Sequence, residues 1–182
     1  MKKALIVVDM QRAFFANESL EARRSELTKA CNELIERARA HDCSVFMLRT
    51  LHQRDRSTWS LNMLDDGQGY LLDGDQDGAY VDGLIVDKTK EIIKTRDSGF
   101  WQTDLLTHLR QNAITDVVIC GVSTHTCVAE TSSDAYSANL RVELAIDGIG
   151  THDPAFHEST LALLKQEYRM KTLHNDEISW KK

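Results

Sequence analysis

The stretch Ile114–Asp134, ITDVVICGVSTHTCVAETSSD, decides how the rest of the chain is interpreted. Within it, Asp116 to Gly121 is a short apolar, β-branched run that ends in glycine, which is typical of a buried strand. A tight turn over residues 122–124 follows, and the side-chain oxygen of Ser123 or Thr124 is expected to cap the helix that comes next. The pattern therefore predicts a strand–turn–helix unit.

Cys127 falls in the first turn of that predicted helix, just beyond the carboxyl end of the strand. Open α/β sheets place their chemistry at this edge. A helix N-terminus offers free N–H groups and a partial positive charge, which favours a thiolate and predicts a lowered thiol pKa. Position and charge both indicate a nucleophile. The alternative is that a lone cysteine after a strand is a small core residue, and this stretch alone does not choose between the two.

Length and composition predict one domain over residues 1–182 with a sizeable core. A hydrophobic content of 42% and a charged content of 27% are ordinary for a soluble globular protein. The net charge of -6 gives no support to a nucleic-acid or membrane partner. No apolar run approaches the length of a membrane span.

The N-terminal sequence MKKALIVVDMQ is expected to be a first strand and not a signal peptide, because Asp9, Gln11 and Arg12 soon interrupt its apolar run. A cytoplasmic location is therefore expected. The four cysteines, Cys31, Cys43, Cys120 and Cys127, form no CxxC pair, and disulfides are not expected in that compartment. Cys31 and Cys43 are interpreted as packing residues.

Strands and helices alternate along the chain. Strands are expected at residues 4–8, 44–48, 91–95, 116–121, 142–146 and 170–173, and helices at 19–41, 103–111, 124–138 and 155–168. Asn17 is expected to cap the first of these helices, and Asp153 the last, with Pro154 in its first position. This alternation predicts an α/β fold: a three-layer α-β-α sandwich with a central, mostly parallel Rossmann-like sheet of about six strands. The irregular, glycine-rich stretch Thr50–Asp87 is expected to be either a lid or binding segment, or a surface excursion.

Three chemically useful residues follow strands of this predicted sheet. Asp9 ends the first strand, Lys94 lies at the end of the third, and Cys127 follows the fourth. Right-handed crossovers bring the carboxyl ends of all strands to one edge. Alone, Asp9 could be a turn or capping residue, but three such residues at equivalent strand ends indicate a catalytic site.

These residues also lie in segments that resemble a known family. IVVDMQRAF, IIKTRDSGFWQTDL, VVICGVSTHTCVAETSSDAY and VELAIDGIGTHD resemble the isochorismatase-like cysteine hydrolases, which include nicotinamidases, N-carbamoylsarcosine amidases and ureidoacrylate amidohydrolases. The resemblance covers Ala4 to about Leu164 and is weak between Thr50 and Asp87. It implies an Asp–Lys–Cys triad of Asp9, Lys94 and Cys127.

The resemblance implies hydrolysis of an amide or carbamoyl C–N bond in a small molecule through a thioester on the cysteine. It also implies a non-proline cis peptide at Val122–Ser123. Backbone N–H groups of Ser123 and Cys127 would hold the oxyanion. Isochorismatases, which cleave a vinyl ether, need no thiol, so the presence of Cys127 favours C–N hydrolysis without excluding the isochorismatase reaction.

One departure from the family bears on metals. Nicotinamidases carry an Asp-x-His motif and a further histidine near the second strand, whereas the corresponding stretch here is RTLHQRD. His52 lacks the aspartate two residues before it, and one histidine is not a metal site. No metal and no other cofactor is expected. The substrate pocket is expected to include Phe14, His52, Trp59 and Phe100.

Other polar residues are weaker candidates. A dyad of His125 with Cys127 is not expected, because residues two apart on a helix face different ways. His152 and His157 are better explained by capping or surface roles, and Asp147 could orient loops at the active edge. The arginines that could bind a substrate carboxylate, although solvation is their default, are Arg49, Arg54, Arg56 and Arg96.

Two other function classes stay open: a binding or scaffold protein that has lost turnover, and a peroxide-sensing protein that uses Cys127. The expected partners are a small-molecule substrate and further copies of the chain, with no nucleic acid and no membrane. A dimer or higher homo-oligomer is predicted, with Trp59, Met63 and Tyr70 as apolar contacts.

Overall fold

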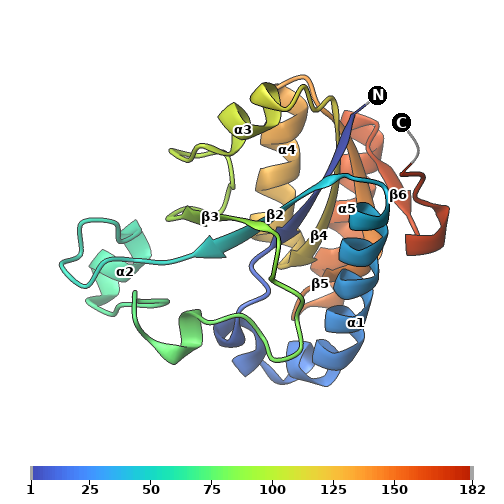
Figure 1. The fold of residues 1–182 in the computed structure, drawn as a ribbon. Helices are drawn as coiled ribbons and strands as arrows, with labels where there is room; N and C mark the ends of the chain where they lie inside the picture. The colour runs from blue at the N-terminus through green and yellow to red at the C-terminus, as the bar shows by residue number, and fades with distance from the viewer. Residues whose placement is uncertain (1, 181–182) are drawn as a thin grey trace.

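A six-stranded parallel sheet forms the centre of the computed structural model, which describes residues 2–180 (Figure 1). The strands are β1 (Lys3–Val8), β2 (Ser44–Thr50), β3 (Lys90–Lys94), β4 (Asp116–Val122), β5 (Arg141–Gly150) and β6 (Lys171–Leu173). Their order is β3-β2-β1-β4-β5-β6, and every pairing is parallel. The predicted α/β class and strand number are confirmed.

Helices cover both faces of this sheet (Figure 1). They are α1 (Glu18–Ala40), α2 (Leu61–Asp66), α3 (Leu105–Gln111), α4 (Ala129–Ser137) and α5 (Pro154–Tyr168). Helix α1 packs over the central strands, α4 packs against α5, and right-handed crossovers place α1 on the face opposite α4 and α5. Residues Ala4–Val8 of β1 are consequently fully buried, which explains their unbroken apolar sequence.

The two long helices begin at the caps that the sequence predicts. The side chain of Asn17 accepts a hydrogen bond from the backbone N–H of Ser19 (2.9 Å). The side chain of Asp153 accepts from the N–H of Ala155 (2.9 Å), and Pro154 occupies the first turn of α5, where a missing N–H costs nothing. None of the helices within residues 2–180 is long and apolar enough to cross a membrane.

The segment after β4 differs from its predicted form. Residues Thr124–Val128 form one π-helical turn before α4, and the side chain of Ser123 makes no capping hydrogen bond. The hydroxyl of Thr124 lies 2.8 Å from Nδ1 of His157 instead. The predicted side-chain cap is therefore wrong, because tertiary contacts with α5 use the hydroxyl that would have made it.

Strand β5 continues past its predicted end. The register of β4 and β5 shifts between Ile119 and Gly121, and this irregularity lets β5 run on to Gly150. Asp147 consequently lies inside the strand, where its carboxylate accepts from the N–H of Asn175 (2.8 Å) and pairs with His174 (2.7 Å). Asp147 anchors the C-terminal segment, so its predicted part in the active edge is wrong.

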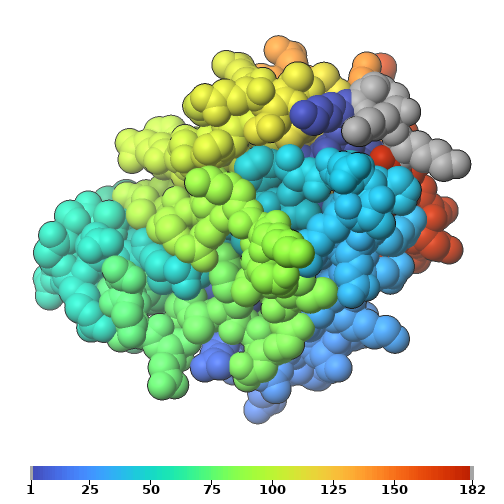
Figure 2. All heavy atoms as spheres, in the orientation of Figure 1, coloured from blue at the N-terminus to red at the C-terminus, as the bar shows by residue number. Residues whose placement is uncertain are grey.

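The irregular stretch between β2 and β3 forms a lobe that extends beyond the sheet, drawn from cyan to green in Figures 1 and 2. It contains α2 and a short 3-10 turn, Gln76–Gly78. Trp59 and Met63 are 7% and 9% exposed, so both are packed within their own chain, while Tyr70 is 45% exposed. Only Tyr70 of the three predicted subunit contacts is available at the surface, and oligomerisation stays a prediction.

Candidate active site

The residues predicted at three strand ends meet at the carboxyl edge of the sheet. Asp9 follows β1, Lys94 closes β3, and Cys127 lies in the π-helical turn after β4. The Lys94 ammonium nitrogen lies 2.7 Å from Oδ2 of Asp9 and 3.5 Å from Sγ of Cys127. All three residues are buried. The structure therefore places a carboxylate, an ammonium group and a thiol in one cluster.

Asp9 adopts an unusual backbone conformation where the chain leaves β1. Its φ is 48°, in the left-handed region, which aspartate tolerates better than most residues. Its backbone N–H donates to the carbonyl of Leu48 (3.1 Å), and its carbonyl accepts from the N–H of Gln11 (2.7 Å). These bonds hold the turn against its strain, so the position of the Asp9 carboxylate is set by the surrounding backbone.

Thr50, which the sequence analysis did not single out, joins Asp9 to Lys94. Its hydroxyl accepts from the Lys94 ammonium (2.8 Å) and donates to Oδ1 of Asp9 (3.1 Å). The ammonium also donates to the carbonyl of Arg96 (3.0 Å). The ion pair is thus embedded in hydrogen bonds, as a buried charge requires. The sequence could have indicated Thr50 by its position at the carboxyl end of β2, at the same edge of the sheet as Asp9 and Lys94.

Gln11 in turn holds Thr50. The Gln11 side chain is fully buried, and its amide accepts from the N–H of Thr50 (2.8 Å) and donates to the carbonyl of Thr50 (2.9 Å). The same amide nitrogen donates to the carbonyl of Gly78 (2.9 Å). One side chain therefore ties the end of β2 and the lobe to the segment that follows Asp9.

Close approach of β4 to β1 requires glycine at position 121. Gly121 has a φ of +116°, and a Cβ there would lie 2.0 Å from the carbonyl oxygen of Val8. The next peptide bond, Val122–Ser123, is cis, as the family resemblance implies. Beyond it, the N–H groups of Thr126 and Val128 both donate to the carbonyl of Ser123 (3.2 Å each), which shapes the turn that carries Cys127.

The electrostatic environment of Cys127 is opposite to the one the sequence predicts. Burial, followed by the negative charge of Asp9, raises the pKa of the Cys127 thiol well above its ordinary value, although Lys94 opposes the shift. Burial also opposes the charge on Lys94, but Asp9 and Cys127 outweigh it and raise the pKa of that ammonium group. A single helical turn does not offset desolvation and a neighbouring carboxylate, so the resting sulfur is a thiol.

A cavity of about 220 Å³ opens beside this cluster. Its lining residues are Phe14, Thr50, His52, Ser60, Met63, Tyr70, Leu71, Thr95, Arg96, Asp97, Thr126 and Cys127. The rings of Phe14 and Tyr70 meet edge to face with centroids 6.1 Å apart. Burial, together with the charges of Asp77 and Asp9, raises the pKa of Tyr70 to about 12, so its hydroxyl is protonated at neutral pH.

Two of the four predicted pocket residues, Phe14 and His52, line this cavity, and two do not. The indole N–H of Trp59 donates to the carbonyl of Gln53 (2.9 Å), and the ring is packed inside the lobe. Phe100 packs against the hydrophobic core. Trp59 and Phe100 were therefore wrongly assigned, since an irregular segment has no periodicity that tells which side chains face inward.

The residues around His52 do not fit the metal site that nicotinamidases carry. Nδ1 of His52 lies 2.9 Å from the carbonyl oxygen of Thr58, and the Thr50 hydroxyl is already bonded to Asp9 and Lys94. Burial and then the charges of Arg96 and Lys94 lower the pKa of His52. Within residues 2–180, no group of three or more His, Cys, Asp or Glu side chains is placed to hold a metal ion.

The other histidine candidates belong to a separate cluster. Nδ1 of His125 lies 2.8 Å from the hydroxyl of Thr151, and its ring packs on those of His152 and Phe156. His157 bonds Thr124. Burial lowers the pKa of both His125 and His157. These contacts agree with the expectation that His125 forms no dyad with Cys127.

Arg96 is the one candidate arginine that lines the cavity. Its guanidinium donates to the carbonyls of Thr58 (2.8 Å), Thr95 (2.5 Å) and Trp59 (3.3 Å), which ties the lobe to the end of β3. The other three make contacts elsewhere: Arg49 pairs with Glu91, Arg54 pairs with Asp75, and Arg56 lies over the ring of Trp59.

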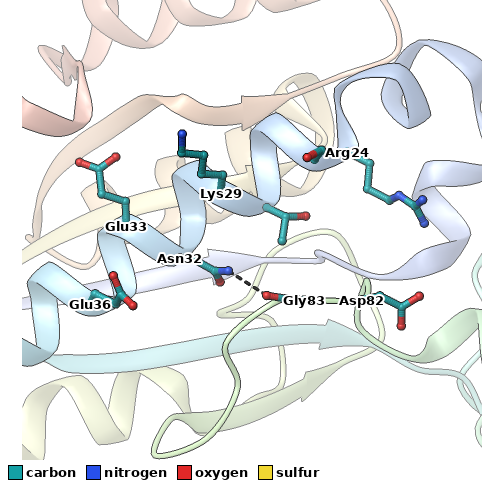
Figure 3. A pocket seen from close by; sticks show the side chains of 9 residues that line it. Arg24, Lys29, Asn32, Glu33, Glu36, Asp82 and Gly83 are labelled. Atoms are coloured by element: carbon teal, nitrogen blue, oxygen red, sulfur yellow. Dashed lines mark hydrogen bonds between the residues drawn. The ribbon is translucent and has the colours of Figure 1, made fainter.

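A larger hollow, of about 710 Å³, lies between α1 and the loop at Asp82 and Gly83 (Figure 3). The side chain of Asn32 donates to the carbonyl of Gly83 (2.8 Å) and fastens the loop to the helix. Charges of both signs surround this hollow, and Asp9, Lys94 and Cys127 do not line it. Cys127, in contrast, lines the smaller cavity, which is therefore the candidate active site.

The fold defines an α/β protein of the doubly wound, parallel class, with a carboxylate, an ammonium group and a thiol at the carboxyl edge of its sheet. The family model named Isochorismatase domain matches residues 3–175. The chain therefore belongs to the isochorismatase family, which points to hydrolysis of the amidohydrolase or nicotinamidase type.

Individual relatives span nearly the whole chain. A protein named probable inactive nicotinamidase, from Arabidopsis thaliana, is 27% identical over 181 residues, which cover 94% of this chain and 92% of that protein. N-carbamoylsarcosine amidase from Thermoplasma acidophilum has a TM-score of 0.83 and 25% identity, and the match covers 98% of this chain and 99% of that protein's chain. A nicotinamidase/pyrazinamidase from Bacillus subtilis has a TM-score of 0.85 at 22% identity, and the match covers 96% of this chain and 100% of that protein's chain. This likeness shows the shared fold.

Proposed function

We propose that the protein is a cysteine-dependent hydrolase that cleaves an amide or carbamoyl C–N bond of a small molecule. The observation that carries this proposal is the Lys94 ammonium nitrogen, 2.7 Å from the Asp9 carboxylate and 3.5 Å from the sulfur of Cys127, a residue that lines the cavity. This arrangement supplies a nucleophile, a carboxylate base beside it and a cation paired with that base.

In the first half-reaction, the Cys127 sulfur attacks the carbonyl carbon while Asp9 takes the thiol proton. A C–S bond forms, the C–N bond breaks, and Asp9 passes the proton to the leaving nitrogen, which departs as the amine or ammonia. The raised thiol pKa supports this sequence, because the proton is still on sulfur when the substrate arrives and can serve the leaving group.

In the second half-reaction, Asp9 takes a proton from a water molecule whose oxygen attacks the thioester carbon. The C–S bond breaks, the acid departs, and Asp9 returns the proton to the Cys127 sulfur. The sum is one amide and one water converted to an acid and an amine. The backbone N–H groups of Ser123 and Cys127 are assigned to the oxyanion. The bonds from the flanking residues, Thr126 and Val128, to the Ser123 carbonyl support the turn geometry that this role needs.

The cavity limits the size of the substrate. A volume of about 220 Å³ is small for a ligand site, so a compact amide fits and a peptide does not. The edge-to-face pair of Phe14 and Tyr70 offers apolar surface. Thr50 and Lys94 hold the base in place and need no metal, so no step uses one.

The test is a turnover screen of small amides, carbamoyl compounds and isochorismate with the wild type, Cys127→Ala and Cys127→Ser. We expect amide or carbamoyl turnover in the wild type, none in Cys127→Ala with folding unchanged by circular dichroism, and a covalent acyl adduct on Cys127 by mass spectrometry under rapid quench.

Turnover of isochorismate that persists in Cys127→Ala would establish the vinyl-ether reaction instead. Tight binding of the same compounds without turnover would favour the scaffold function. Reversible oxidation of Cys127 by peroxide, with no hydrolysis of any compound, would favour the sensor.

A further inference from the structure

A second carboxylate, that of Asp97, lines the active cavity together with Cys127. Its Oδ1 atom accepts a hydrogen bond from the Cys127 thiol, at 3.8 Å from the sulfur. Asp97 occupies the turn after β3, three residues beyond Lys94, and is exposed to the cavity opening. The nucleophile is therefore flanked by two carboxylates, of which the mechanism uses one.

This second carboxylate has no ion-pair partner within the described residues, although its charge acts on Lys94. Among residues 2–180, no lysine, arginine or histidine nitrogen lies within ion-pair distance of Asp97, whereas Asp9 is paired with Lys94. The neighbouring Arg96 points its guanidinium at backbone carbonyls, including that of Thr58 (2.8 Å). Asp97 therefore presents a carboxylate that forms no ion pair within the described residues to a ligand that enters the cavity.

The charge of Asp97 makes the Cys127 sulfur less reactive. The charge of Asp97 adds to burial and Asp9 in raising the pKa of Cys127, which lowers the fraction of the sulfur present as thiolate. A neutral side chain at position 97 would leave a more reactive thiol. A positive charge brought by the substrate would remove the same penalty at the moment of binding.

We propose, resting on the proposed amide hydrolysis, that Asp97 is a specificity-determining residue that selects substrates with a cationic nitrogen two bonds from the scissile carbonyl carbon. The distance supports this spacing: an acyl carbon bonded to the Cys127 sulfur places its α-substituent within hydrogen-bond reach of a carboxylate 3.8 Å from that sulfur. α-Amino amides fit this description, and amides with a carboxylate at the same position do not.

Binding is tested first, in the Cys127→Ala background, so that the readout does not depend on turnover. The probes are glycinamide, its uncharged isostere propionamide and the anionic malonamate, measured by calorimetry at a pH at which glycinamide is protonated. We expect glycinamide to bind about tenfold more tightly than propionamide, as one charge-assisted hydrogen bond allows, and malonamate to bind most weakly.

Adding Asp97→Asn should abolish the preference for glycinamide and improve malonamate binding. The matched control is Asp42→Asn, which removes one exposed carboxylate at the amino end of β2, the opposite edge of the sheet. Equal affinities for glycinamide and propionamide before the change, or an unaltered ratio after it, would overturn the assignment. An equal loss for all three probes would do the same, because it would indicate a structural role.

Turnover gives the second test. In the wild-type background, Asp97→Asn should lower the ratio of kcat/KM for glycinamide to kcat/KM for propionamide by about tenfold. Loss of turnover with every amide would overturn the assignment, because Asp97 would then take part in proton transfer. Absence of turnover in the wild type with all amides, together with a retained binding preference, would refute the proposed hydrolysis while supporting the cationic subsite.

Discussion

Lys94 and Asp9 form an ion pair of 2.7 Å in which both side chains are fully buried. Removing water from two charges is expensive, and their attraction repays it only when other hydrogen bonds complete the geometry. Thr50 and the carbonyl of Arg96 provide those bonds. Both the stability of the fold and the proposed reaction therefore depend on this ion pair.

The variant Lys94→Met should destabilise the fold and stop turnover. It leaves the Asp9 carboxylate buried without its cation, for which we expect a loss of about 3–5 kcal/mol in the free energy of unfolding. Urea denaturation followed by circular dichroism measures this loss. The double variant Asp9→Asn with Lys94→Met should recover a large part of it, because no uncompensated charge remains. The single variant Asp9→Asn completes the cycle. If the loss in the double variant equals the sum of the losses in the two single variants, the pair is not coupled.

Alkylation of Cys127 in the wild type should rise continuously with pH. The thiolate reacts and the thiol does not, and the pKa of Cys127 is raised, so the reactive fraction is small at neutral pH and grows about tenfold per pH unit below that pKa. Iodoacetamide labelling of the Cys127 peptide, followed by mass spectrometry between about pH 6 and pH 9, should show no plateau. A plateau near pH 7 would mean that the resting sulfur is a thiolate.

Asp9→Asn should move alkylation and turnover in opposite directions. Loss of the Asp9 charge removes one cause of the raised Cys127 pKa, so labelling at neutral pH should be faster than in the wild type. Turnover should be lost, because Asp9 is the group that the proposed mechanism assigns to protonate the leaving nitrogen. Labelling rates and amide hydrolysis are measured on the same preparation. Asp42→Asn, at the opposite sheet edge, is the control and should change neither quantity.

Gly121→Ala should be severely destabilising. Its φ of +116° strains any other residue, and the new Cβ would lie 2.0 Å from the Val8 carbonyl oxygen, so β4 and β1 must separate beside Asp9. The control is Gly74→Ala, which has a φ of +86° but no atom within 4 Å of the added Cβ. We expect a loss of about 1 kcal/mol for Gly74→Ala and several times that for Gly121→Ala, measured by urea denaturation. Equal losses would contradict the steric explanation.

The sequence by itself determined the alternation of strands and helices, the caps at Asn17 and Asp153, and the strand-end positions of Asp9, Lys94 and Cys127. These are local properties or follow from one rule: parallel strands joined by right-handed crossovers end at one edge. Periodicity and cap chemistry do not depend on distant segments, so they are visible in the chain. The GVSTHTC block added the family resemblance, and with it the cis peptide at Val122–Ser123.

Only the tertiary structure decided the electrostatic state of the site and the walls of its cavity. The raised pKa of Cys127 arises from burial and from a carboxylate more than a hundred residues earlier in the chain. Thr50 became part of the site because β2 lies beside β1, and Asp97 because the turn after β3 reaches Cys127. Trp59 and Phe100 were excluded because side-chain direction in an irregular segment depends on packing. Desolvation, charge pairing and cavity shape all depend on residues that are far apart in the sequence, and only folding brings those residues together.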